Sequence, residues 1–416
     1  MGPSDLNPSD LNPSDLNPPG VPGDITRESA PLRARFLSAM ADIDPQAWDR
    51  LFDQANPFMR HAFLHALEAS GSVCGETGWQ PLHLLLEQGD EAVAAMPLYL
   101  KSHSYGEFVF DWSWAEAYRR NGLDYYPKLL TAVPFSPVSG PRIGLSPGCD
   151  ENAALTGAVS AVEQIARQCG ASGWHLLFPD QAQQIRLADS GLAETLLQRE
   201  DVQFHWSNAG YTDFDAFLGS LRSSRRKNIR RERRRVAEAG IELQRLTGDA
   251  ITASAWSAFY DCYRRTYQKR SGHDGYLNRS FFSRLLDSQR DHLLLVTASQ
   301  GQAVIGSALL LYDETHLFGR YWGAMEPVDC LHFEVCFYQG IEFCIERGIQ
   351  TFDPGTQGEH KLMRGFEPVR TTSYHWLSDA RFQAALAGWI EREQQGVTAY
   401  EESARGYLPY RRDQDG

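Results

Sequence analysis

One pattern of predicted elements occurs twice in the chain, about 210 residues apart, and this repeat constrains the fold more than any other sequence feature. Residues 81–102 have the pattern of a strand, a tight turn at Gly89-Asp90 and a second strand, and residues 292–314 repeat it. A third β-rich stretch follows each hairpin, at 106–114 and at 315–325. A single chance match would not keep the same offset throughout, so we expect two lobes of similar fold.

The correspondence continues beyond the hairpins with a helix, a glycine and a strand. Residues 153–180 have this pattern in the first copy and residues 332–355 have it in the second. Helices that alternate with strands in this way indicate mixed sheets flanked by helices. We therefore predict an α/β (α+β) fold in two lobes, residues 25–212 and 213–416. The length of 416 residues agrees, because it exceeds what one hydrophobic core supports.

Composition excludes several classes of protein. A content of 42% hydrophobic and 12% aromatic residues excludes a wholly disordered chain, and the longest apolar runs fall short of the roughly 20 residues that span a bilayer. The net charge of -13 argues against a surface that coats nucleic acid throughout. Seven scattered cysteines without a CxxC pair indicate reduced core residues and no metal site. We expect a cytoplasmic protein without an integral membrane segment.

Two segments stand outside the repeated pattern. Residues 1–24 contain three copies of PSDLN and are predicted to form a disordered tail. Residues 115–144 form a long connection, rich in Tyr and Pro, that the second copy lacks, and their aromatic content favours an ordered segment. Aromatic residues here are more often core, but their density allows them to line a pocket wall, which makes Trp112 and Tyr126 candidate substrate-binding residues.

The most unusual segment is residues 222–235, which hold nine basic side chains against one acid, Glu232. Apolar residues at near-helical spacing within 214–240 predict a helix, or a helix pair broken around Ser223-Ser224. Most charge runs are solvated helix faces, but so many bases on all sides of a helix cannot easily all be paired. Arginine forks suit phosphate oxygens, so we predict binding of RNA backbone or of a phosphorylated small molecule. The candidate donor-phosphate ligands are Arg225, Arg226, Lys227, Arg230 and Arg231.

A strand that ends in an acid and enters a glycine-rich turn, residues 352–369, is the second candidate for chemistry. Polar groups just beyond the carboxyl end of a strand commonly lie at a binding crevice of an α/β domain. A carboxylate there can hold an amine or accept its proton, and lysine or arginine can hold an anion. The alternative is a capped turn with solvent-exposed bases. The candidates are Asp353 and His360 as catalytic residues and Lys361, Arg364 and Phe366 as substrate-binding residues.

Tyr321 and Trp322, at the end of the strand predicted over 315–325, are further candidate substrate-binding residues. His332 and Glu334 follow, but they are two residues apart and do not share a helix face, so a joint metal site is not expected. The sequence has no GxxxxGK[ST] loop, GxSxG elbow, HExxH helix or GxGxxG turn. The sequence therefore lacks the residues that phosphate-loop hydrolases, esterases, zinc proteases and dinucleotide-binding enzymes require.

The duplicated lobe, the segment SSRRKNIRRERRR and the segment GIQTFDPGTQGEHKLMRGFEPV together resemble the FemAB-like branch of the GNAT acyltransferase superfamily. The resemblance covers about residues 30–410 and is closest to bacterial proteins described as predicted N-acyltransferases or peptidoglycan biosynthesis/recognition proteins. It implies tandem GNAT-like lobes. It also implies that the helix from Arg225 to Arg231 and the turn with Asp353, Lys361 and Phe366 match family motifs, and that this turn lies near the acceptor site.

In Fem transferases an aminoacyl-tRNA donates its amino acid to an amine on a peptidoglycan precursor, so the resemblance implies an N-acyltransferase without a bound cofactor. The sequence differs from them in lacking a coiled-coil arm, since 241–291 predicts short helices. It also lacks the Q/RxxGxG/A loop of ordinary GNAT enzymes after Trp322-Gly323. We expect aminoacyl-tRNA as the donor, with acyl-CoA as the alternative. An inactive module that binds a cell-wall precursor or nucleic acid is the alternative of another class.

Amide formation requires that the donor carbonyl and the acceptor nitrogen are aligned, that a proton is accepted and that an oxyanion is stabilised. No covalent nucleophile is needed. We expect Asp353 and His360 to orient or deprotonate the acceptor amine, and Lys361 and Arg364 to bind acceptor anions. The basic helix would bind the donor phosphates, which places the expected site in the second lobe.

Overall fold

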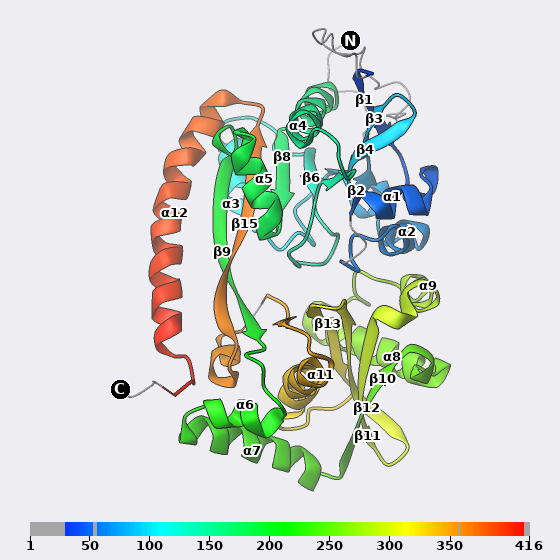
Figure 1. Ribbon diagram of the computed structural model, residues 1–416, viewed down its shortest axis with the longest axis vertical. Coiled ribbons are helices and arrows are strands. Elements are labelled where there is room, and N and C mark those ends of the chain that lie inside the picture. The colour runs from blue at the N-terminus through cyan, green and yellow to red at the C-terminus, as the bar shows by residue number, and fades with distance from the viewer. Residues whose placement is uncertain (1–29, 53–55, 357, 412–416) are drawn as a thin grey trace. The chain divides into compact units, whose positions relative to one another are not determined.

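The computed structural model describes residues 30–52, 56–356 and 358–411. The predicted disordered tail, residues 1–24, lies outside these ranges. Within them, no helix is long and apolar enough to cross a membrane. The chain forms two compact units, and three elements pass from one into the other: strands β9 (Leu197–Ser207) and β15 (Glu367–Leu377) and helix α12 (Ala380–Gly406) (Figure 1).

Unit 1 comprises Met1–Asp201 and Thr371–Gln395, and unit 2 comprises Val202–Arg370 and Gly396–Gly416. The lobes expected from the sequence were continuous stretches of chain. The units are not continuous, because the second half of β15 and most of α12 pack with the N-terminal part of the chain.

Unit 1 contains two sheets with helices against them. Its further elements are β1 (Leu32–Leu37), α1 (Pro45–Leu51), α2 (His61–Ala69), β2 (Trp79–Pro81), β3 (His83–Gln88), β4 (Glu91–Met96), β5 (Tyr99–Lys101), α3 (Trp112–Arg120), β6 (Lys128–Thr131), β7 (Gly144–Leu145), α4 (Glu151–Gln168), β8 (Gly173–Leu177) and α5 (Gln181–Asp189). One sheet has the order β1-β3-β4-β7 and is antiparallel. The other has the order β15-β8-β6-β5-β2, in which only β6 and β8 are parallel. Helix α4 contacts both sheets, and its apolar face supplies much of the core between them.

The prediction of a β-rich stretch at residues 106–114 is wrong. Residues 106–110 form no strand, and α3 begins at Trp112. Gly106 and Phe108 have φ values of 82° and 64°, in the left-handed region, which interrupts an extended chain. Glu107 and Asp111 turn into the interior to meet Lys128. The connection at 115–144 is ordered, as expected; it contains strand β6 and ends at the first residue of β7.

Unit 2 contains one mixed sheet that is covered on both faces. Its elements besides β9, β15 and α12 are α6 (Phe214–Ser220), α7 (Ser223–Glu238), β10 (Ile241–Thr247), α8 (Ala253–Ser271), α9 (Arg279–Gln289), β11 (Leu293–Gln300), β12 (Ala303–Tyr312), β13 (His316–Ala324), α10 (Leu331–Phe333), a π-helix η8 (Glu334–Tyr338), α11 (Gln339–Arg347), β14 (Thr351–Asp353) and a 3₁₀-helix η9 (Glu359–Arg364). The strand order is β10-β11-β12-β13-β14-β9, with β13 and β14 parallel and the other pairs antiparallel.

The sequence of β11 explains why the sheet is buried on both faces. In the continuous apolar run from Leu293 to Val296, successive side chains point to opposite faces. Leu294 and Val296 pack in the core beneath α11, whereas α8 contacts β12 and β13. The short helices predicted within 241–291 are confirmed as α8 and α9. Residues 214–240 form a helix pair, α6 and α7, that is broken at Leu221 and Arg222, next to the expected Ser223-Ser224, and the basic segment lies in α7.

Gly323 permits the close approach of α8 to β13. A Cβ atom at this position would lie 1.8 Å from the backbone oxygen of Cys262 in α8. We expect Gly323→Ala to lower the free energy of unfolding by about 1–3 kcal/mol, because a backbone atom rather than a flexible side chain has to move. Chemical denaturation measures the change. Gly219→Ala in α6, where nothing lies within 4 Å of the added Cβ, is the control and should not destabilise the protein; equal effects of the two variants would contradict the close approach.

Candidate functional site

The turn after β14 brings a buried carboxylate and a buried amine to the same glycine. Asp353, the last residue of β14, is 2% exposed, and Lys361 in η9 is 1% exposed. The Oδ1 atom of Asp353 accepts a hydrogen bond from the backbone nitrogen of Gly355 at 2.8 Å, and Nζ of Lys361 donates to the backbone oxygen of the same residue. Gly355 has a φ of 92°, a conformation that favours glycine. The turn therefore holds both side chains through one residue.

Asp353 keeps one oxygen available. Its Oδ2 atom is buried and has no hydrogen-bond partner among the described residues. Burial lowers the pKa of Lys361 to about 8, against the attraction of Asp353, and the charge of Arg320 adds to the lowering. Lys361 is thus mainly cationic at neutral pH. The pair offers a carboxylate that can accept a proton and a cation that can stabilise an oxyanion, two of the functions that amide formation needs.

His205 lies beside this pair and was not predicted from the sequence. It belongs to β9, whose antiparallel register with β14 pairs Trp206 with Phe352 and so brings His205 next to Asp353. Its Nε2 atom is 3.7 Å from Oδ1 of Asp353. Burial lowers the pKa of His205, and this outweighs the attraction of Asp353. A neutral imidazole therefore flanks the carboxylate. No local sequence signal joins β9 to β14, since the pairing spans about 150 residues.

His360 lies in an aromatic group rather than in contact with Asp353. Its ring centroid is 5.9 Å from that of His332 and 5.6 Å from those of Phe333 and Phe337. Its Nε2 atom is buried and has no hydrogen-bond partner in the described part of the chain. Burial, Arg364 and Lys361 all lower the pKa of His360, and burial lowers that of His332 to about 4. Both imidazoles are therefore neutral at pH 7, and His360 can accept or donate one hydrogen bond through Nε2.

A π-helix carries part of this aromatic group. Residues 331–347 form one helical segment, the helix predicted at the start of 332–355, but its middle turn, η8, is a π-helix. Such turns are rare and are frequently found at functional sites. Glu334 and Tyr338 at its two ends both point to the basic helix α7, where Glu334 pairs with Arg233 at 3.1 Å. Among the described residues, no group of three or more His, Cys, Asp or Glu side chains could hold a metal ion.

The structure separates the other predicted substrate-binding residues. Tyr321 and Phe366 are core residues: Tyr321 packs on Tyr263 and Phe282, and Phe366 is fully buried. Trp322 is partly buried, and its ring centroid lies 5.5 Å from that of His332, so it borders the aromatic group of His360. Contact of each with a substrate stays a prediction.

Trp112 and Tyr126 belong to unit 1. Trp112 is 42% exposed and packs edge-on against Tyr105 at 5.0 Å between centroids. The hydroxyl of Tyr126 shares a 2.8 Å hydrogen bond with Ser104. Their role in a pocket wall also stays a prediction.

Arg364 is engaged within unit 2. Its guanidinium forms a 2.7 Å ion pair with Glu232 of α7, bonds the hydroxyl of Tyr338 at 2.9 Å and donates to the backbone oxygen of His360 at 2.8 Å. An acceptor anion, which the sequence led us to expect at Arg364, would have to compete with Glu232 for these donors.

The basic helix α7 divides into paired and unpaired side chains. Arg226 and Lys227 make no hydrogen bond or ion pair with any described residue; Arg226 is half-buried and Lys227 exposed. Arg225 contacts the sulfur of Met363, and Arg231 bonds Asn228. The charges at the start of the helix are therefore those most available to an anion.

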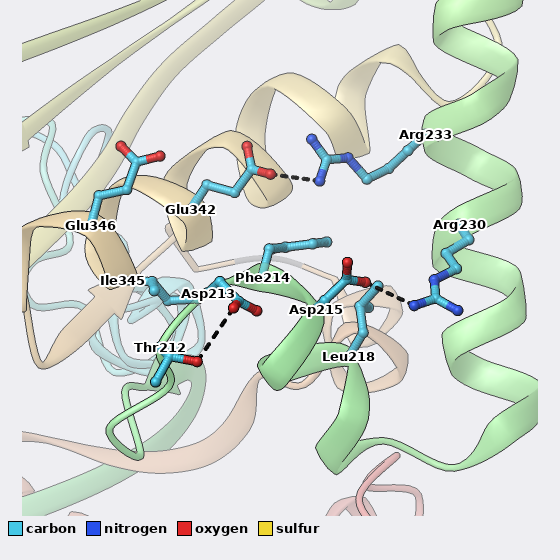
Figure 2. Close-up of a pocket in the computed structure, with 10 residues that line it drawn as sticks. All are labelled: Thr212, Asp213, Phe214, Asp215, Leu218, Arg230, Arg233, Glu342, Ile345 and Glu346. Carbon is cyan, nitrogen blue, oxygen red and sulfur yellow. Dashed lines mark hydrogen bonds and ion pairs between the residues drawn. The ribbon is translucent and has the colours of Figure 1, made fainter.

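A cavity of about 470 Å³ lies between α6, α7 and α11 (Figure 2). Its lining residues are Thr212, Asp213, Phe214, Asp215, Leu218, Arg230, Arg233, Glu342, Ile345 and Glu346. Figure 2 shows Arg230 directed to Asp215 and Arg233 to Glu342, and each ion-pair distance is 2.7 Å. Four acids against two arginines make this cavity unsuitable for phosphate. The side chains of Arg230 and Asp215 are 57% and 79% exposed, and such an exposed pair is weak enough for a phosphate to compete for Arg230.

Unit 1 buries a second group of charges, the Lys128 cluster, formed by Lys101, Glu107, Asp111 and Lys128. Nζ of Lys128 donates to Glu107 at 2.6 Å, to Ser104 at 2.9 Å and to Asp111. Nζ of Lys101 is 3.9 Å from Glu107. Burial lowers the pKa of Lys101 to about 7 and raises that of Glu107 to about 7. Burial opposes ionisation of Asp111 too, but Lys128 holds the pKa of Asp111 below its ordinary value. Lys128 is therefore the main cation that stabilises the charged forms of Glu107 and Asp111.

Comparison with known proteins gives a family and a fold. The FemAB_like family model, described as peptidoglycan biosynthesis/recognition, matches residues 39–412. No curated protein matches the sequence. Among solved structures, FemX is 12% identical, with a TM-score of 0.50, and the alignment covers 83% of this chain and 98% of FemX. At this identity the likeness is one of fold.

Two further structures are similar at lower scores. A tandem GNAT protein from the clavulanic acid biosynthesis pathway is 12% identical, with a TM-score of 0.45, covering 84% of this chain and 99% of its own. L-PGS from Bacillus licheniformis is 10% identical, with a TM-score of 0.48, covering 80% and 91%. The predicted fold class, α/β with mixed sheets flanked by helices, is confirmed.

Proposed function

Because this chain belongs to the FemAB-like family of peptidoglycan biosynthesis/recognition proteins, we propose that it is an N-acyltransferase that forms an amide on an amine acceptor. The observation that carries this proposal is the buried Oδ2 atom of Asp353, which has no hydrogen-bond partner among the described residues and lies on the same turn as the buried cation of Lys361. A carboxylate with a free, desolvated oxygen is a suitable acceptor for the proton of an attacking amine.

The proposed reaction is a direct transfer. The nitrogen of the acceptor amine attacks the carbonyl carbon of the donor, and Oδ2 of Asp353 takes the proton that this nitrogen loses. The ammonium of Lys361 stabilises the oxyanion of the tetrahedral intermediate. When the bond between the carbonyl carbon and the leaving oxygen breaks, Asp353 returns its proton to that oxygen. His360 orients the amine through its Nε2 atom, and His205, whose pKa burial lowers, is a neutral neighbour of Asp353.

We propose aminoacyl-tRNA as the donor and a peptidoglycan precursor, or a related small molecule with a primary amine, as the acceptor. The unpaired Arg226 and Lys227 at the start of α7 support a donor that carries phosphates, and the exposed Arg230 and Arg231 extend the same basic surface. Acyl-CoA, which also carries phosphates, is the alternative donor.

The transfer is tested with total tRNA charged with labelled amino acids, and separately with labelled acyl-CoA, in a bacterial extract that contains cell-wall precursors. A labelled product whose formation is abolished by RNase treatment of the donor supports aminoacyl-tRNA. Labelling from acyl-CoA alone reassigns the donor. Binding of a precursor without transfer from either donor overturns the proposed activity in favour of a recognition module. The Asp353→Asn protein is the control in each assay.

Removal of the unpaired charges should weaken tRNA binding and its salt dependence. For Arg226→Ala/Lys227→Ala we expect lower affinity for tRNA and a slope of log K against log salt that is smaller in magnitude by about 1 to 2, because two phosphate contacts are lost. Filter binding at several salt concentrations measures the slope. Arg119→Ala, which removes an exposed arginine of unit 1, is the control. A slope equal to that of the unchanged protein would contradict binding by α7.

A further inference from the structure

The single acid of the basic segment, Glu232, does not pair with a neighbouring arginine of its own helix. Its carboxylate forms a forked contact with Arg364, at 2.7 Å to Nη2 and 3.2 Å to Nε, and accepts a hydrogen bond from the hydroxyl of Tyr338. The side chain of Glu232 is 18% exposed and that of Arg364 is 8% exposed. A forked ion pair with little exposure to water has a fixed geometry as well as a favourable energy. Glu232 therefore joins α7 to two other elements, η9 and η8.

Arg364 also contacts the turn that holds the candidate catalytic residues. Its Nη1 atom donates to the backbone oxygen of His360 at 2.8 Å, and its guanidinium lies 3.4 Å from the centroid of the Phe333 ring. Lys361 follows His360 in the chain, so the orientation of its peptide group depends on the same hydrogen bond. The Nε and Nη2 atoms of the same guanidinium donate to Glu232 and Tyr338. Three residues therefore hold the guanidinium of Arg364 in place.

The opposite face of α7 carries the basic side chains. Ile229 and Val236 are buried, Glu232 points inward with them, and Lys227, Arg230 and Arg231 are exposed. One helix thus presents cations outward and holds the catalytic turn inward through Glu232. A second contact, from Arg225 to the sulfur of Met363, joins the start of the helix to the same turn at 3.0 Å.

We propose that Glu232 and Tyr338 are positioning residues that couple occupation of α7 by a phosphate-bearing donor to the placement of His360 and Lys361. This inference rests on the proposed function, since it takes α7 as the surface for donor phosphates and the turn as the site of transfer. It assigns Arg364 the role of a connector between them instead of that of an anion ligand. A donor that holds α7 in place then also holds the groups that act on its carbonyl.

The kinetic test uses Glu232→Gln, which keeps the size of the side chain and removes its charge, and Tyr338→Phe. We expect Glu232→Gln to lower kcat by about 10- to 100-fold, because small misplacement of a catalytic group has effects of this size, while KM for the donor changes less than about threefold. The two substitutions together should cost less than the product of their separate effects, since both act through Arg364. Asp329→Asn, which removes the exposed partner of Arg235 on the same helix, is the matched control and should leave kcat unchanged.

Hydrogen exchange provides a readout that does not depend on turnover. Uncharged tRNA should slow exchange of the backbone amides in peptides that cover residues 359–366 of the unchanged protein. In Glu232→Gln the same tRNA should bind with an unchanged salt slope but should leave this exchange unaffected. An equal slowing in both proteins, or an equal kcat, would overturn the coupling. Absence of transfer by the unchanged protein would overturn the proposed function instead, and the exchange experiment would still decide whether α7 and the turn are coupled.

Discussion

Replacement of Lys128 by Met should lower the free energy of unfolding by about 3–5 kcal/mol. Lys128 is fully buried, and its ammonium is the closest cation to both Glu107 and Asp111. Without it, the buried carboxylate of Asp111 must either remain charged without a near cation or take up a proton, and Glu107 keeps only the more distant Lys101, 3.9 Å away. The Met side chain fills most of the volume, so the loss reflects charge rather than a cavity. Urea denaturation followed by circular dichroism measures it.

Two controls show whether the cause is the unpaired charge. The triple variant Lys128→Met/Glu107→Gln/Asp111→Asn removes three of the four charges of the cluster and leaves Lys101, whose pKa of about 7 lets it lose its proton. It should therefore recover part of the loss, because a buried ion pair as a whole contributes little. Arg120→Met removes a cation from an exposed pair with Glu116 and should leave the denaturation midpoint in place. If the triple variant is less stable than Lys128→Met alone, the explanation by unpaired carboxylates is wrong.

Asp353→Asn should lower kcat/KM for amide formation by about 10²- to 10⁴-fold, the usual effect of removing a general base. The amide has nearly the shape of the carboxylate and can still accept the hydrogen bond from Gly355, so the turn is retained. Labelled product formed at limiting donor concentration measures the ratio. Glu359→Gln changes an exposed carboxylate of the same turn, which contacts only Tyr400 in the described structure, and serves as the matched control. A similar loss in both variants would contradict the role of Asp353.

The pH dependence of the same reaction tests Lys361. Its amine is cationic below a pKa of about 8 and neutral above it, so stabilisation of the oxyanion should be lost as pH rises through 8. We expect kcat/KM to fall on the alkaline side, after subtraction of the rate at which the donor hydrolyses without protein. A profile that stays flat to pH 9.5 would show that the cation is not needed.

The elements that sequence reasoning found are those set by local pattern. The two β-hairpins, the helices α8 and α9 and the helical segment over 214–240 follow from apolar spacing and turn residues over short stretches, although the spacing left one helix or a broken pair open for that segment. The resemblance to the FemAB-like family, drawn from the basic segment and the turn at 352–369, is confirmed by the match over residues 39–412. Asp353 and Lys361, both predicted, meet at Gly355 because they belong to one turn.

What the sequence did not reveal depends on pairs that are distant along the chain. The stretch at 106–114 has the composition of a strand, but Glu107 and Asp111 are drawn inward by Lys128, about 20 residues later. Arg364 appeared to be a free cation, yet its partner Glu232 lies 132 residues earlier. His205 reaches Asp353 only through the pairing of β9 with β14. Each of these contacts joins residues that are distant along the chain, so no short sequence pattern predicts it.

The return of Thr371–Gln395 to unit 1 has a consequence for synthesis of the chain. On the ribosome, residues 30–201 emerge long before the strand β15 that pairs with β8 and before Leu386 and Ile390, which pack on Trp114 and Tyr118. Until then β8 has an open edge, and an apolar cluster of unit 1 has no cover. Unit 1 thus completes its folding only after almost the whole of unit 2 has been translated, so a nascent chain must carry an unfinished first unit while the second one forms.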